Sequence, residues 1–88
     1  MFEAVQFVEP KNVPEPTETV LGEYGTEDAA VDQARAAREA FMAKGSDDYA
    51  WWIVREQGAK LANFIADSKS NKEFVLDLTS GELVELPI

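Results

Sequence analysis

One segment near the middle of the chain, residues 49–56, constrains the fold more than any other. Its sequence, Tyr-Ala-Trp-Trp-Ile-Val-Arg-Glu, is rich in the aromatic and β-branched residues that favour β-strands. Successive side chains of a strand point to opposite faces, so Trp51 lies on one face and Trp52 on the other. Because both faces are apolar, we predict a central strand whose two faces both need cover.

A single helix is predicted from about residue 27 to residue 44. Thr26 is a suitable N-cap residue, and Glu27 and Asp28 follow in the first turn, where the helix dipole favours negative charge. Small and apolar residues then recur at helical spacing along one side: Ala30, Ala34, Ala37 and Phe41. Gly45 is the residue expected just after the helix end. Because alanine dominates the apolar side, we expect the helix to lie close against a sheet.

Five further segments are predicted to be strands. They are residues 2–8, 18–24, 60–67, 73–78 and 82–86. Residues 60–67 also fit a helix, and we choose the strand because a meander with the flanking strands uses little chain. Three prolines between residues 10 and 16 predict a loop, since proline removes backbone donors. The predicted order of elements is therefore ββαββββ.

These elements define an α+β fold, a two-layer sandwich with one helix on a mostly antiparallel sheet of five to six short strands. The 88 residues are expected to form a single domain. A helix of this length spans roughly 27 Å and covers one face of such a sheet, but not both. We therefore expect either Trp51 or Trp52 to face away from the helix. The proline-rich loop, the chain termini, a second subunit or a partner then covers that side.

The absence of histidine and cysteine excludes much of enzyme chemistry. Histidine is the usual proton-transfer group near neutral pH, and cysteine supplies thiolate nucleophiles, disulfides and zinc ligands. The sequence also contains no glycine-rich phosphate loop, nucleophile elbow or metal-ligand spacing. We therefore predict a protein without enzymatic activity, with no catalytic residues, cofactor or metal. Carboxylate chemistry is the enzymatic alternative that the composition leaves open.

The charge balance bears on the partners. The 17 acidic and 8 basic residues give a net charge of −9, which repels nucleic-acid phosphates and anionic lipids. No apolar run approaches the ~20 residues of a membrane-spanning helix, and the first residues do not resemble a signal peptide. We expect a soluble cytoplasmic protein that binds neither nucleic acid nor membrane directly.

The function that the sequence favours is a protein-interaction module that acts through an aromatic sheet face. Aromatic residues and arginine dominate interface hot spots. The candidate contact residues belong to the predicted central strand: Tyr49, Trp51, Trp52 and Arg55. The partner is a second copy of the chain or another protein. Two other classes remain, a small-molecule-binding or carboxylate-dependent enzyme domain, and an acidic nucleic-acid mimic that binds a basic partner.

Overall fold

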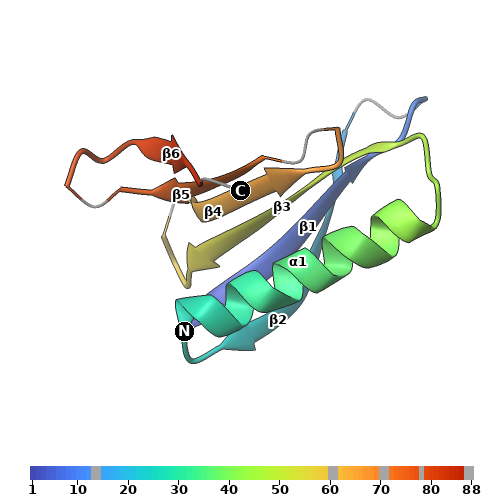
Figure 1. Cartoon of the computed structure of the whole chain (residues 1–88). Helices are drawn as coiled ribbons and strands as arrows, with labels where there is room; N and C mark the ends of the chain where they lie inside the picture. The colour runs from blue at the N-terminus through green and yellow to red at the C-terminus, as the bar shows by residue number, and fades with distance from the viewer. Residues whose placement is uncertain (13–14, 60–61, 70–71, 78, 87–88) are drawn as a thin grey trace.

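The protein is built from two layers, an antiparallel sheet and one helix packed across it, as the computed structural model shows (Figure 1). The structure describes residues 1–12, 15–59, 62–69, 72–77 and 79–86. The elements follow one another as β1 (Phe2–Glu9), β2 (Thr17–Tyr24), α1 (Glu27–Ala43), β3 (Tyr49–Glu56), β4 (Ala62–Asp67), β5 (Glu73–Leu76) and β6 (Leu83–Glu85). The α+β class and the ββαββββ order predicted from the sequence are confirmed.

The strands form one sheet in the order β2-β1-β3-β4-β5-β6, and every neighbouring pair is antiparallel. Only β1 and β3 are neighbours without being consecutive strands, because α1 crosses over the sheet between β2 and β3. The choice of a strand over a helix for residues 60–67 is confirmed for residues 62–67, while residues 60 and 61 lie outside the described part. Strand β3 lies inside the sheet, as its two apolar faces predicted.

The helix begins and ends close to the predicted residues. The Thr26 hydroxyl accepts a hydrogen bond from the Ala29 N–H at 3.2 Å, which satisfies one of the free donors of the first turn. The helix ends at Ala43, one residue before the predicted end, and Gly45 follows with φ of 68°. That left-handed conformation is easily adopted by glycine, so the residue stops the helix as expected.

The core lies between α1 and the sheet and contains Trp52, which is fully buried. The Trp52 indole Nε1 donates to Gln6 Oε1 at 2.9 Å, and the Phe41 ring meets the indole edge-on at 5.5 Å. Room for the indole comes from small buried residues of the sheet and the helix: Ala4, Ala30, Ala34, Ala50 and Ala66. Trp52 is therefore the tryptophan that faces the helix, and Trp51 faces away.

Helix α1 covers only part of its side of the sheet. It packs mainly on β1, β3 and β2, and the β5–β6 hairpin extends beyond it (Figure 1). One side chain of α1 connects the helix to β5. The Arg35 guanidinium donates two hydrogen bonds, of 2.9 and 2.8 Å, to the Glu73 carboxylate on β5. Hydrogen bonding to Glu73 raises the pKa of Arg35 above its ordinary value, so the guanidinium stays charged at neutral pH.

Replacement of the helix N-cap is expected to lower stability measurably. We expect Thr26→Ala to reduce the free energy of unfolding by about 1 kcal/mol, because the Ala29 N–H loses its partner. Thr26→Ser is the matched control, since serine keeps the accepting hydroxyl. Urea denaturation followed by circular dichroism measures both values, and equal losses in the two variants would contradict the capping role.

Candidate functional site

The face of the sheet opposite α1 is the candidate site, and we call it the open face. Side chains alternate along each strand, so the neighbours of the helix-facing core residues point to this side. An apolar row crosses five strands there, residue opposite residue: Val20, Val5, Ile53, Ile65 and Phe74. No described helix covers this row, and four of its five side chains keep part of their surface exposed, whereas Val5 is fully buried.

Three aromatic rings lie beside that row, and we call them the aromatic strip: Phe7, Trp51 and Tyr49. Phe7 on β1 stands opposite Trp51 on β3, and their rings stack with centroids 5.2 Å apart and planes 8° from parallel. The Tyr49 ring continues the strip, 5.4 Å from Trp51 and tilted by 36°. All three side chains are partly exposed. Contacts between the rings stabilise this arrangement of the strip.

The chain covers its own open face only in part. Arg55 on β3 forms ion pairs with Glu3 on β1 at 3.6 Å and with Glu18 on β2 at 3.5 Å. Since β1 lies between β3 and β2, the Arg55 side chain lies across β1 and shields apolar surface with its stem. Val5 on β1 is fully buried, whereas Val20 on the outer strand keeps 47% of its surface exposed.

Charged groups surround the apolar centre, and most are carboxylates. By their register positions the acidic residues of the open face are Glu3, Glu9, Glu18, Glu23, Asp67 and Glu85. The basic residues there are Arg55 and Lys69. The open face therefore combines an apolar, aromatic centre with a negative surround, and it is complementary to a partner that is apolar and positively charged.

Three of the four contact residues predicted from the sequence lie on the open face, and one does not. Tyr49, Trp51 and Arg55 share it. Trp52 was expected as a possible contact, but it is enclosed between the sheet and α1 and cannot touch a partner. Sequence analysis missed Phe7, although residues 2–8 carry apolar side chains on both faces, and that pattern was the available signal.

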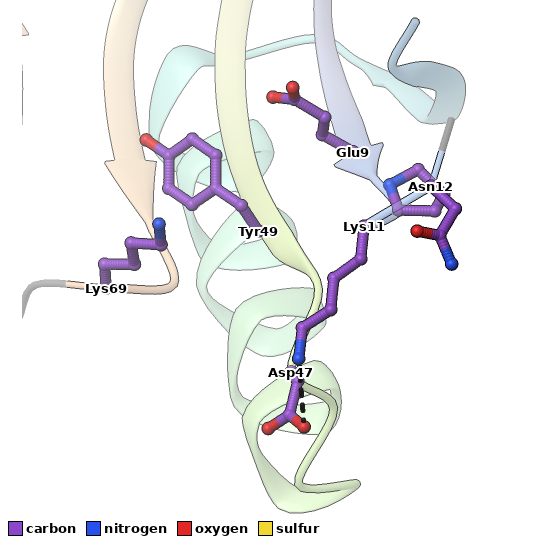
Figure 2. Close-up of a pocket in the computed structure, with 7 residues that line it drawn as sticks. Glu9, Lys11, Asn12, Asp47, Tyr49 and Lys69 are labelled. Carbon is purple, nitrogen blue, oxygen red and sulfur yellow. Dashed lines mark ion pairs between the residues drawn. The ribbon is translucent and has the colours of Figure 1, made fainter. Parts of the chain in front are cut away.

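A cleft of about 600 Å³ opens at the Tyr49 end of the aromatic strip (Figure 2). Its walls come from the end of β1, the start of β3 and the residues around them: Glu9, Pro10, Lys11, Asn12, Asp47, Tyr49 and Lys69. Lys11 and Asp47 form an ion pair of 3.6 Å on one side, marked by the dashed line in Figure 2. On the other side the Lys69 ammonium lies 4.8 Å from the centre of the Tyr49 ring.

The Tyr49 hydroxyl is held at the same end of the sheet. It donates a hydrogen bond of 3.4 Å to the Asp67 carboxylate on β4. Burial, followed by the negative charge of Asp67, raises the pKa of Tyr49 above its ordinary value. The phenol therefore stays neutral at physiological pH and offers an aromatic face with a fixed direction.

The described residues show no sign of two other kinds of site, a metal centre and a membrane-spanning helix. Within the ranges that the structure describes, no group of three or more aspartates and glutamates is arranged to hold a metal ion. None of the described helical residues form a segment long and apolar enough to cross a membrane. Comparison of the chain with protein-family models, curated proteins and solved structures found no match. No activity, ligand or partner is therefore transferred from a relative.

Proposed function

We propose that the protein is a non-enzymatic interaction module that binds a protein partner through the open face. The observation that supports this most directly is the Phe7–Trp51 stack, which lies beside the apolar row on the face that α1 does not cover. Aromatic side chains held in fixed positions are typical anchors of protein interfaces. The lack of histidine and cysteine in the sequence favours binding over catalysis.

The charges favour a basic partner over a second copy of the chain. The net charge is −9, and the open face carries more carboxylates than basic groups. Two copies meeting face to face would bring carboxylates together, and like-charge contacts oppose association. A partner segment with apolar side chains flanked by lysine or arginine would cover the row and neutralise its surround.

Two short peptides of equal charge test the proposal. One alternates lysine and leucine (acetyl-Lys-Leu-Lys-Leu-Lys-Leu-Lys-amide), and the other has serine in place of leucine. In titrations of ¹⁵N-labelled protein, we expect the leucine peptide to shift the amide signals of Phe7, Trp51 and Ile53 in a saturable manner. We expect the serine peptide to bind at least about tenfold more weakly, because it keeps the positive charge but has no apolar side chains to cover the apolar row.

Matched variants show which face binds. We expect Trp51→Thr to weaken binding of the leucine peptide about tenfold, since it removes the central anchor. Val84→Thr is the control, because Val84 is 46% exposed on the other side of the same sheet, and its binding constant should not change. Equal effects of the two variants would overturn the assignment of the open face. A concentration-dependent dimer in sedimentation that Trp51→Thr abolishes would overturn the choice of a basic partner.

A further inference from the structure

We infer that the cleft at the Tyr49 end of the aromatic strip receives the guanidinium group of an arginine carried by the partner. This inference rests on the proposed function for the identity of the bound chain. The site itself is separate from the apolar row, since it lies past the end of β1 and beside the start of β3 (Figure 2).

The first argument is that a cation of the chain itself, the Lys69 ammonium, already lies against the Tyr49 ring. The Lys69 ammonium lies 4.8 Å from the ring centre, within the range in which an aromatic ring attracts positive charge. Lys69 is exposed, and its ammonium is carried on a flexible side chain, so a ligand can displace it. The chain's own lysine thus marks the position where a cation from outside is stabilised.

The second argument is a carboxylate at the same cleft without a cation of its own. Glu9 is exposed, stands opposite Tyr49 across the β1–β3 pair, and lines the same cleft. Among the residues that the structure describes, no lysine or arginine forms an ion pair with Glu9, whereas Asp47 is paired with Lys11. The cleft therefore offers an aromatic ring and an unmatched negative charge together.

Arginine suits this combination better than lysine does. Its planar guanidinium stacks on an aromatic ring and presents two parallel donors to a carboxylate. A lysine ammonium is a more strongly hydrated point charge, and Lys69 already supplies one. An arginine that displaces Lys69 keeps the contact with the Tyr49 ring and adds hydrogen bonds to Glu9.

The test compares two small probes that have nearly the same shape but different charge. N-acetyl-arginine amide and N-acetyl-citrulline amide are titrated into ¹⁵N-labelled protein. We expect the arginine probe to shift the amide signals of Glu9, Tyr49 and Lys69 in a saturable manner, and the citrulline probe to bind at least about threefold more weakly. Equal binding of the two probes would overturn the inference.

Three variants separate the site from general attraction by an acidic protein. We expect Lys69→Ala to tighten arginine binding about threefold, because it removes the competing cation. We expect Glu9→Gln to weaken it about threefold. Glu82→Gln makes the same charge change at an exposed turn on the other end of the sheet and should have no effect. If Glu82→Gln weakens binding as much as Glu9→Gln, only long-range attraction is present and the site is wrong.

The two proposals fail in different ways. If the lysine–leucine peptide binds the open face but the arginine probe does not bind the cleft, the cleft is wrongly assigned and the interaction module stands. If the arginine probe binds as expected but Trp51→Thr leaves peptide binding unchanged, the open face is wrongly assigned as the peptide-binding surface. Circular dichroism of each variant verifies that it is folded before binding is measured.

Discussion

Trp52→Ala is expected to reduce the free energy of unfolding by about 3–5 kcal/mol. The indole is fully buried, it contacts Phe41 edge-on, and it donates a hydrogen bond to Gln6. Truncation leaves a cavity among residues that are mostly alanines and cannot fill it. A domain of this length has a total stability of roughly 4–13 kcal/mol, so the variant loses a large share of it. Urea denaturation followed by circular dichroism gives the difference.

The neighbouring tryptophan provides the control for this experiment. Trp51→Ala removes a side chain of equal size from a partly exposed position on the open face. We expect it to cost less than about 2 kcal/mol, because the lost surface was already in contact with water. A larger loss for Trp51→Ala than for Trp52→Ala would contradict the orientation of strand β3.

The second large effect is expected where the helix meets the sheet. Ala34 is 1% exposed and belongs to the side of α1 that lies against the core. We expect Ala34→Leu to destabilise the protein by about 1–3 kcal/mol, because the added carbons have no space unless the helix moves away. Thermal and urea denaturation measure the change.

The exposed side of the same helix offers a matched substitution. Ala36→Leu adds the same atoms at an exposed position two residues away, where no packing partner limits the side chain. We expect a change within about 0.5 kcal/mol in either direction. Should Ala34→Leu prove as harmless as Ala36→Leu, the close approach of α1 to the sheet would be wrong.

The sequence allowed most of the secondary structure to be predicted, because each element carries a local signal. Thr26 and Gly45 mark the ends of the helix, and the residues of β3 strongly favour a strand. The strand over residues 62–67 was harder to predict, since its apolar residues fit both periods. Its pairing with β3 on one side and β5 on the other decides between them, and the apolar pattern of the segment alone does not reveal either pairing.

The side of β3 that faces the helix could not be predicted, because hydrophobicity is similar on its two faces. The structure shows that side-chain volume makes the difference. Around Trp52 the neighbours across the strands are Gln6 and Ala66, whereas Phe7 stands beside Trp51. A bulky indole and a closely packed helix both need small neighbours, which only the Trp52 side provides. Which side chains stand next to each tryptophan, and therefore how large they are, is known only once strand order and register are known.

The candidate site was predicted in part for the same reason. Tyr49, Trp51 and Arg55 follow from the composition of one strand. Phe7 and Ile65 join them only through the strand order β1-β3-β4, which no local pattern specifies. The cleft beside Tyr49 is still less predictable, since it brings together Glu9, Asp47 and Lys69 from three separate turns and strand ends.

The placement of two consecutive indoles on opposite sides of one strand has a practical consequence for fluorescence. The two residues are adjacent in the chain, yet Trp52 is fully buried and Trp51 is partly exposed to solvent. A variant that keeps only Trp52 reports on packing of the interior through its fluorescence. A variant that keeps only Trp51 reports on events at the open face. The protein thus contains two built-in optical reporters that distinguish loss of structure from occupation of its outer side.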